Sequence, residues 1–309
     1  MSEPIITVVG SFAVGMTIRA SRIPVLGETL FGSNFDMGPG GKGSNQAVGV
    51  ARLGAKAFFA GIIGNDKLGE IATDLYLKEG VNTKYLIKTD KKATGVGFII
   101  LNEKGENSII LDMGANKLMD AEFVDKIEPQ IAKSDLVMSV LELPLEAAGR
   151  AMELGKKHGK CTILNPAPAV RLDENVLKNI EYLTPNETEL RILLGLAPDD
   201  QTSNIELAKR LQSLGVKNLI VTRGEKGALV VTKKDLFELP GIAVDVVDTT
   251  GAGDAFNSGL AMALAEGKDL EYAVKFANCA GAIECKELGV IPAMGDRETV
   301  EGLYNKVYE

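Results

Sequence analysis

Short apolar runs and longer segments of helical period alternate along most of the chain. The runs are rich in β-branched and aromatic residues, and they predict buried strands at residues 5–10, 57–64, 135–142, 161–167 and 218–224, with a strand leading into a helix at 180–190. Apolar positions recur every three to four residues in the segments 44–55, 67–80 and 145–159, which predicts amphipathic helices. This alternation predicts an α/β fold, a Rossmann-like three-layer structure in which helices cover both faces of a parallel sheet.

Two regions interrupt the alternation. Residues 93–115 contain two apolar strands around the polar sequence NEKGEN, which predicts a β-hairpin. Residues 17–38 have no helical period and carry several turn signals. We expect a small layer of four or five strands, inserted from about residues 13–40 and 93–115 into a single domain of residues 1–309. Because ligands of open α/β sheets bind at the carboxyl ends of the strands, this layer is better placed to be a lid than only a cover of the core.

The overall composition excludes several classes of protein. Of the 309 residues, 45% are hydrophobic and 25% are charged, as in soluble globular proteins. The net charge of −8 argues against a nucleic-acid surface, which needs a basic footprint. The first residues, MSEPIITVVG, lack the basic segment of a signal peptide, and no apolar stretch is long enough to span a bilayer. We therefore expect a cytoplasmic protein whose partners are small molecules, not nucleic acids or membranes.

The cysteines and the single histidine offer little for catalysis. Cys161, Cys279 and Cys285 have neither metal-type nor paired spacing, as expected of reduced thiols in a cytoplasmic enzyme. His158 stands just before Gly159 at the end of a predicted helix, where we expect a solvated helix cap. Ser-His-Asp catalysis and histidine-based metal sites therefore have almost no residues to draw on.

A glycine-rich segment at residues 38–43, GPGGKG, matches the pattern of dinucleotide-binding turns, and Asp66 follows at a suitable distance. The residues before it are polar and do not form a buried strand, so a nicotinamide site remains only an alternative. The segment also falls short of a P-loop, because Gly43 separates Lys42 from Ser44.

The same segment has a more direct physical interpretation. It offers close backbone approach, several N–H groups, the Lys42 cation and the Asn45 amide in a first helical turn. This set suits a polyhydroxylated or phosphorylated ligand. The alternative is a glycine-rich turn followed by an ordinary helix.

Two further turns follow predicted strands. In TPNETE, residues 184–189, Thr184 or Asn186 could cap a helix, or the two acids could hold Mg²⁺ through waters, because Mg²⁺ prefers oxygen ligands. In TRGEKG, residues 222–227, the two glycines fit either a plain β-turn or a contact of N–H groups and the Thr222 hydroxyl with a nucleotide phosphate.

The segment DTTGAGDAF, residues 248–256, combines small residues with acids. Gly251, Ala252 and Gly253 lack bulk, so their N–H groups can converge on an anion, and Asp254 follows at the start of a predicted helix. An anion hole beside a carboxylate is what phosphoryl transfer to a hydroxyl requires. The N–H groups stabilise charge on the transferred group, and the carboxylate takes the proton.

Together these segments resemble the ribokinase family of carbohydrate kinases, the PfkB group, over essentially the whole chain. The resemblance is carried by GGKGSNQA at 40–47, LELPLEA at 141–147, NPAPA at 165–169, TPNETE at 184–189, TRGEKGA at 222–228 and DTTGAGDAF at 248–256. It implies an ATP-dependent sugar kinase with a ribokinase-like fold and a β-sheet lid, and ribose as the first candidate acceptor. It also implies ATP, Mg²⁺ and K⁺ as cofactors, and a homodimer paired through the lid.

The resemblance also implies roles for single residues. Asp254 would be the catalytic base, and Gly251, Ala252 and Gly253 would form the anion hole. The sugar would contact Gly41, Lys42, Gly43, Ser44, Asn45, Glu142 and Asp254. The nucleotide would contact Asn186, Thr222, Arg223, Gly224, Glu225, Lys226, Gly227, Gly253 and Asn278. Glu189, with Asn186, would organise Mg²⁺ and its waters. A monovalent cation would be held by Asp248, Thr250 and backbone groups around Glu284, Glu287, Gly289 and Ala293.

One departure from the family's pattern concerns the sugar. The family usually has Gly-Ser-x-Asn-x-Asp after the first strand, and this Asn and Asp hold sugar hydroxyls. Here residues 10–15 are GSFAVG, and Ala13 and Gly15 cannot make those hydrogen bonds. The acceptor is therefore either ribose held by other residues, or another sugar, a ketose or a nucleoside. A non-catalytic sugar-binding sensor on the same fold is the alternative function.

Overall fold

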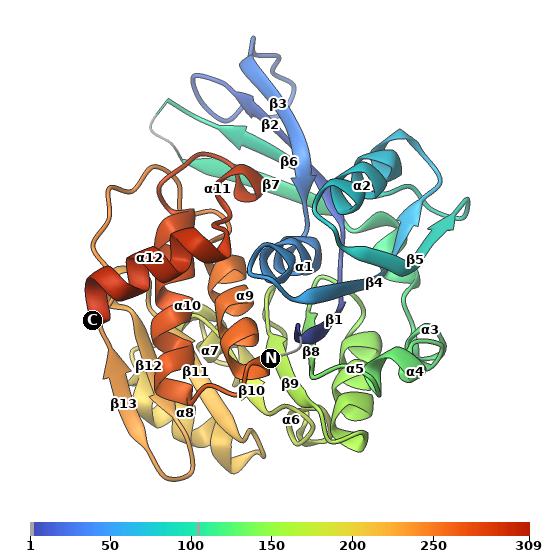
Figure 1. The fold of residues 1–309 in the computed structure, drawn as a ribbon. Coiled ribbons are helices and arrows are strands. Elements are labelled where there is room, and N and C mark those ends of the chain that lie inside the picture. The colour runs from blue at the N-terminus through green and yellow to red at the C-terminus, as the bar shows by residue number, and fades with distance from the viewer. Residues whose placement is uncertain (1–2, 104–105) are drawn as a thin grey trace.

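A nine-stranded sheet runs through the centre of the molecule in the order β13-β12-β11-β10-β9-β8-β1-β4-β5 (Figure 1). The computed structural model describes residues 3–103 and 106–309. The strands are β1 (Ile5–Val9), β4 (Lys56–Gly64), β5 (Asn82–Thr89), β8 (Leu136–Val140), β9 (Cys161–Asn165), β10 (Tyr182–Leu183), β11 (Asn218–Thr222), β12 (Ala228–Val231) and β13 (Leu236–Leu239). Neighbouring strands from β11 to β5 are parallel, whereas β12 and β13 form an antiparallel edge.

The parallel strands form where the sequence is apolar at successive positions, because both faces of the sheet are covered. All residues of β8, LVMSV, are buried, and Val8 of β1 pairs with Phe59 of β4 and Met138 of β8. The predicted α/β fold is thereby confirmed. The sequence pattern does not predict the antiparallel edge, because β12 and β13 are four-residue runs that periodicity alone cannot assign.

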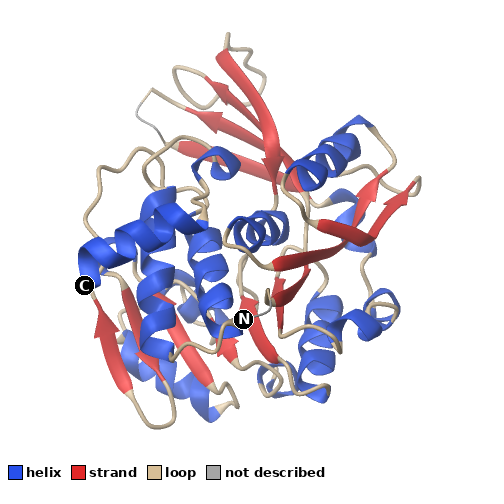
Figure 2. Ribbon diagram, viewed as in Figure 1, coloured by secondary structure: helices blue, strands red, loops and turns tan. Residues whose placement is uncertain are grey.

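Helices pack on both faces of the sheet and create two apolar cores (Figure 2). One core is covered by α1 (Lys42–Arg52), α2 (Lys67–Lys78), α9 (Ala252–Ala265), α10 (Leu270–Glu284) and α12 (Arg297–Tyr308). The other is covered by α3 (Ala121–Asp125), α4 (Glu128–Ile131), α5 (Leu145–Lys157), α6 (Glu174–Leu177), α7 (Glu187–Leu193) and α8 (Asn204–Ser213). Successive residues of β8 enter opposite cores, Val137 the second and Met138 the first. Across the described ranges, the structure contains no helix with the length and apolar character needed to cross a membrane.

A second, four-stranded sheet projects beyond the main sheet in the order β3-β2-β6-β7 (Figure 1). Its strands are β2 (Ala13–Arg19), β3 (Ser33–Gly40), β6 (Gly95–Leu101) and β7 (Asn107–Asp112). This lid sheet confirms the predicted β-layer, although residues 104–105 of the predicted hairpin turn lie outside the described residues.

The base of the lid sheet is nearly free of side chains on one face. Gly15 pairs with Gly38 and Gly97, and the Ala13 row continues the pattern with Gly40 and Gly95. Val14 between them is fully buried in the first core, so Ala13 and Gly15 face the opposite side of the strand.

Asp66, which suggested a dinucleotide site, has a structural role. It caps α2 by accepting a hydrogen bond from Gly69 N at 2.8 Å, and it also binds Thr94 N and Thr94 Oγ1 at 2.8 and 2.7 Å. Residues 38–40 belong to lid strand β3 and do not follow a buried strand. The nicotinamide alternative therefore loses the strand–turn–helix context that it requires.

His158 caps the carboxyl end of α5, as predicted, but it is not simply solvated. Its side chain is partly buried, and Nε2 lies 2.8 Å from Glu128 Oε1. The cysteines are free thiols: Cys161, Cys279 and Cys285.

Candidate active site

Polar residues from four strands meet at the carboxyl edge of the parallel sheet. Ser11 follows β1, Glu142 follows β8, Asn186 follows β10 and Thr222 ends β11. The lid sheet starts at the same edge, because β2 follows β1 and β3 leads into α1. Ligands of open α/β sheets bind at this edge, so the candidate site lies here.

The first turn of α1 packs against the corner between β1 and β2, in a contact that requires glycine. Gly41 has φ 91°, and a Cβ on this residue would lie 2.8 Å from Ala13 N. A Cβ on Gly43 would lie 2.5 Å from Gly10 Cα. The glycines of GGKG therefore allow the start of α1 to approach the segment after β1, which a larger residue would prevent.

Glu142 lies against the amino end of α1. Its Oε2 accepts hydrogen bonds from Ser11 Oγ at 2.7 Å and from Lys42 N at 2.8 Å. Burial raises the pKa of Glu142, and the Lys42 ammonium opposes this shift. The pKa of Lys42 is itself raised, first by Asp254 and further by Glu142 and Glu189. Lys42 is therefore a cation shared by three carboxylates.

Asp254 lies in the first turn of α9, and only 3% of its surface is exposed. Its Oδ2 accepts a hydrogen bond from Asn45 Nδ2 at 2.8 Å, and its Oδ1 accepts one from Gln46 Nε2 at 3.0 Å. Two amides of α1 thus fix the orientation of a carboxylate on α9. Ser44, which was also predicted to contact the sugar, is fully buried.

The residue directly before Asp254, Gly253, leaves part of the amino end of α9 uncovered. Gly251 precedes the helix with φ 86°, a left-handed conformation that glycine adopts without strain. A Cβ on Gly253 would meet nothing within 4 Å, so this part of the turn faces open space. The positive end of a helix dipole therefore opens directly beside the Asp254 carboxylate, an arrangement that can hold an anion next to a base.

Asn186 and Glu189 form a capping box at the start of α7. Asn186 N donates to Glu189 Oε2 and Glu189 N donates to Asn186 Oδ1, both at 2.8 Å. Burial raises the pKa of Glu189, while Lys42 lowers it and Asp254 raises it further. The cap does not remove Glu189 from the site, and its carboxylate suits Mg²⁺, which binds few protein oxygens and keeps several waters.

The residues predicted to contact the nucleotide lie together around the end of β11. Thr222 N donates to Pro185 O at 2.9 Å, which joins the TRGEKG and TPNETE turns. A Cβ on Gly227 would lie 2.5 Å from the carbonyl carbon of Pro240, and Asn278 Nδ2 donates to Pro240 O at 3.4 Å. The rest of the turn consists of Arg223, Gly224, Glu225 and Lys226. The structure therefore brings α10, β11 and the TPNETE segment to one place.

Asn257 connects this nucleotide side to the start of α9. Its Oδ1 accepts a hydrogen bond from Thr184 Oγ1 at 2.7 Å, and its Nδ2 donates to Gly253 O at 2.8 Å. The end of β10 and the Gly-Ala-Gly turn are thereby held in a fixed relation.

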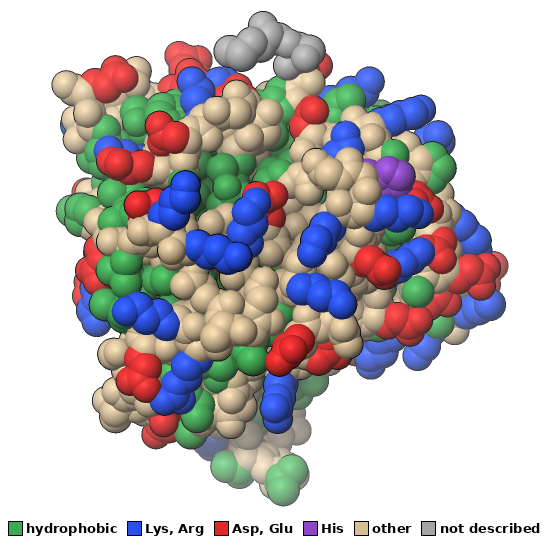
Figure 3. Space-filling view, turned by 90° about the horizontal axis from the view of Figure 1, so that it is seen from below, with side chains coloured by type: hydrophobic (Ala, Val, Ile, Leu, Met, Phe, Trp, Pro, Cys, Tyr) green, Lys and Arg blue, Asp and Glu red, His purple; other side chains and the backbone are tan. Residues whose placement is uncertain are grey.

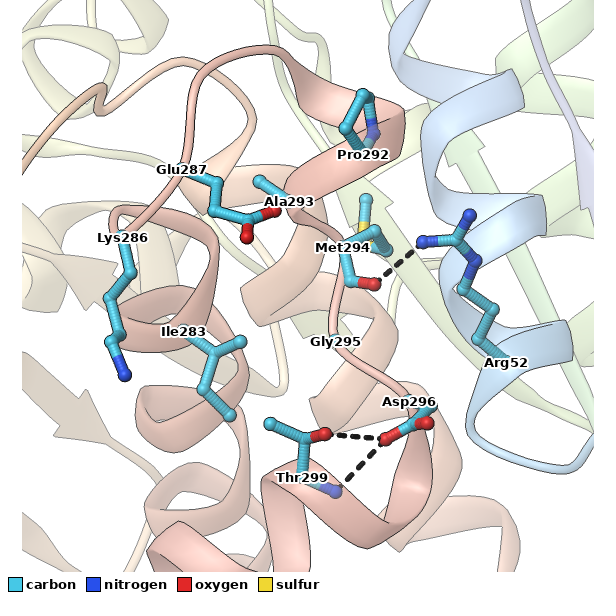
Figure 4. Close-up of a pocket in the computed structure, with 10 residues that line it drawn as sticks. All are labelled: Arg52, Ile283, Lys286, Glu287, Pro292, Ala293, Met294, Gly295, Asp296 and Thr299. Atoms are coloured by element: carbon cyan, nitrogen blue, oxygen red, sulfur yellow. Dashed lines mark hydrogen bonds between the residues drawn. The ribbon is translucent and has the colours of Figure 1, made fainter.

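The predicted cation residues surround the segment between α10 and α11 (Val290–Ala293). Asp248 Oδ1 accepts hydrogen bonds from Thr250 N at 2.9 Å and Thr250 Oγ1 at 2.7 Å. Glu284 is fully buried and neither of its carboxylate oxygens has a hydrogen-bond partner, whereas Glu287 is exposed. Figure 4 shows a hollow beside this segment, with Arg52 and Ala293 in its lining. The lining includes Glu287 and Ala293 of the predicted cation residues, but it does not include Asp254 or its amide partners.

Sequence reasoning missed two residues of the site. Gln46, like Asn45, donates a side-chain hydrogen bond to the Asp254 carboxylate. Ser11 donates a hydrogen bond to the Glu142 oxygen that also accepts one from Lys42 N. Gln46 could have been found from the sequence, because it is an amide residue next to Asn45 in the GGKGSNQA motif. Nothing local marked Ser11, because its partner stands 131 positions away.

The fold and the site define a small-molecule phosphotransferase: an α/β sheet with a β-sheet lid, and a buried, oriented carboxylate beside an open helix amino end. Residues 6–296 match the model of the pfkB family carbohydrate kinases, and the chain belongs to this family. The protein is therefore a carbohydrate kinase, as the motifs indicated.

Named relatives agree with this membership. The chain is 38% identical over 299 residues to a ribokinase of Haemophilus influenzae, a match that covers 96% of this chain and 98% of the relative. It is 39% identical over 271 residues to a deoxyribokinase of Salmonella typhi, covering 87% and 89% of the two chains. A structure of Arabidopsis thaliana ribokinase complexed with ribose and ATP superimposes with a TM-score of 0.91 at 31% identity, covering 98% of this chain and 99% of that one.

Proposed function

We propose that the protein transfers the γ-phosphoryl group of ATP to a hydroxyl group of ribose, with Asp254 as the general base. The observation that carries the proposal is the buried Asp254 carboxylate beside the amino end of α9, which is open at Gly253. The carboxylate takes the proton of the attacking hydroxyl, and the N–H groups stabilise charge on the transferred group. Asn45 and Gln46 hold the base in place, so it needs no reorientation during the reaction.

The acceptor is proposed from the relatives and from the lid. A ribokinase at 38% identity and a deoxyribokinase at 39% are about equally similar to this chain. Similarity therefore does not decide whether the acceptor must carry a 2-hydroxyl group. Ala13 and Gly15 offer no side-chain hydrogen bonds, which leaves Lys42, Asn45 and Glu142 as the polar groups for the sugar. A site that does not hydrogen-bond a hydroxyl discriminates only weakly against its loss. We therefore expect 2-deoxyribose to be accepted alongside ribose.

The proposed cofactors follow the same geometry. ATP would bind along the edge between Asn186 and Asn278, with its phosphates toward Gly253. Mg²⁺ would neutralise phosphate charge and would be held by the phosphates and, through water, by Glu189. K⁺ would lie beside Asp248 and Thr250, with backbone groups around Glu284, Glu287, Gly289 and Ala293 as further ligands. The use of ATP and the free thiols fit a cytoplasmic location.

One face of the lid sheet supports a homodimer. Met37, Phe98 and Ile110 lie in one cross-strand row, and Phe35 extends the same face along β3. Phe35 is 63% exposed and Ile110 is 71% exposed. By contrast, the underside of the molecule carries basic and acidic side chains interspersed (Figure 3). A contiguous exposed apolar face marks an interaction surface, and two copies can pair through the same face about a two-fold axis.

An ADP-release assay over a panel of acceptors tests the proposal. The panel contains ribose, 2-deoxyribose, arabinose, fructose, glucose and adenosine, each with Mg-ATP and K⁺. We expect the highest kcat/KM for ribose, with 2-deoxyribose within about 100-fold of it. A clear preference for a hexose, a ketose or adenosine would contradict ribose as the acceptor. If no acceptor is phosphorylated although sugars bind, the sensor alternative is supported instead.

A further inference from the structure

Glu284, at the end of α10, has a buried carboxylate that lacks any hydrogen-bond partner. The residue has no exposed surface, and both oxygens are unpaired. An ionised carboxylate is strongly disfavoured in a protein interior unless a cation or several donors compensate it. The position therefore calls for a partner.

The Arg52 cation lies close enough to interact electrostatically with Glu284, but its guanidinium donates its hydrogen bonds to other groups. Its Nε and Nη2 each donate to Glu79 at 2.8 Å. Its Nη1 donates to Ile291 O and Met294 O, both at 2.7 Å, and the second of these bonds is visible in Figure 4. Arg52 thus fastens the segment around α11 to α1 and α2, and it donates no hydrogen bond to Glu284.

The Glu284 carboxylate lies at the join between α10 and the segment before α9. A Cβ on Gly251 would lie 2.5 Å from Glu284 Oε1. The carbonyl of the next residue, Cys285, accepts hydrogen bonds from Val247 N at 2.8 Å and from Asp248 N at 3.3 Å. Two carboxylates, Glu284 and Asp248, are thereby brought from separate parts of the chain to the start of the helix that carries the proposed base.

We propose that the side chain of Glu284, together with Asp248 and the surrounding backbone, is a ligand of the monovalent cation; this inference rests on the cation site of the proposed function. The cation is then the missing partner of a buried acid. In the described part of the chain, no group of three or more acidic, histidine or cysteine side chains could enclose a metal ion. Backbone carbonyls must supply the remaining ligands, and these are oxygen donors of the kind that suit K⁺.

Thermal melting of the purified full-length chain tests this assignment. Wild type, Glu284→Gln and Glu298→Gln are compared in KCl and in tetramethylammonium chloride at equal ionic strength. Glu298 is an exposed acid in the first turn of α12, so its replacement removes the same charge at a distance from the site. We expect KCl to raise the Tm of wild type and Glu298→Gln equally, because ligand binding stabilises the folded state. The apparent dissociation constant for K⁺, from melting at graded KCl, should rise at least about tenfold in Glu284→Gln, because ligand charge tunes cation affinity.

The outcomes separate the two proposals. A full KCl response in wild type and in Glu284→Gln would overturn the role of Glu284 and leave the cation site standing. No KCl response in wild type would overturn the cation site and this inference together. Glu284→Ala is the second variant, in case the buried amide prevents folding, and a wild-type response in that variant also overturns the assignment. Glu284→Gln should be at least as stable as wild type in tetramethylammonium chloride, since it removes an uncompensated buried acid.

Discussion

At the residue scale, three carboxylates of this kinase have different surroundings and therefore different chemistry. Asp254 accepts hydrogen bonds from the side chains of Asn45 and Gln46. One oxygen of Glu142 accepts two hydrogen bonds, from Ser11 Oγ and Lys42 N. Glu284 accepts none. Hydrogen-bond donors compensate a buried carboxylate, whereas burial without donors leaves it uncompensated. The proposed base and the proposed cation ligand are thus distinguished by their partners and not by their residue type.

Asp254→Asn should keep the shape of the side chain and remove the base. We expect kcat for ribose to fall at least ~10²-fold, on the scale of general-base catalysis, with nearly unchanged ATP affinity. Steady-state kinetics and calorimetric titration with nucleotide measure the two quantities. Asp199→Asn makes the same change in an exposed loop and should leave kcat unaltered. Near-wild-type turnover of Asp254→Asn would eliminate Asp254 as the base.

At the scale of elements, the site depends on how closely α1 approaches its neighbours. Gly43 touches the backbone of Gly10, and a Cβ on Gly49 would collide with the side chain of Ser258 on α9. These contacts let α1 lie between the β1–β2 corner and α9. The approach brings the amides of Asn45 and Gln46 to the Asp254 carboxylate.

Gly43→Ala should therefore destabilise the protein, because its Cβ would meet backbone that cannot move aside. We expect a loss of about 1–3 kcal/mol in the free energy of unfolding, the usual effect of overpacking. The matched control is Gly302→Ala on α12, where a Cβ meets nothing within 4 Å. That change should stabilise the helix by up to about 1 kcal/mol. Urea unfolding measures both, and equal effects of the two substitutions would refute the close-approach argument.

At the scale of the whole molecule, the lid sheet has two unlike faces. At the base of the sheet the rows of Ala13 and Gly15 are nearly bare, with Leu111 at the far edge, whereas the row of Met37, Phe98 and Ile110 is apolar and exposed. A row without side chains leaves room for a ligand beside backbone groups. An exposed apolar row is stabilised when another surface buries it. The same small sheet could therefore shape the acceptor site and join two subunits.

Ile110→Glu should convert the proposed homodimer into a monomer, because a charge would be buried in the apolar face. Light scattering coupled to gel filtration should change from twice the 32.8 kDa chain mass to that mass. Leu77→Glu, at an 84% exposed site on α2, is the control and should remain dimeric. A monomeric wild type, or a dimeric Ile110→Glu, would show that this face does not pair two copies.

The sequence by itself determined the α/β class and the small second sheet, and it predicted an anion hole beside a base in DTTGAGDAF. These features are local. Helical and strand periods reflect which faces are buried, and the glycine turn before the acid can be recognised from nine consecutive residues. Tertiary structure alone decided that Gln46 holds Asp254, 208 positions away, that Glu284 has no partner, and that β12 and β13 close the sheet edge antiparallel. The partner of a buried charge is set by the packing of segments distant in sequence, and no local pattern records it.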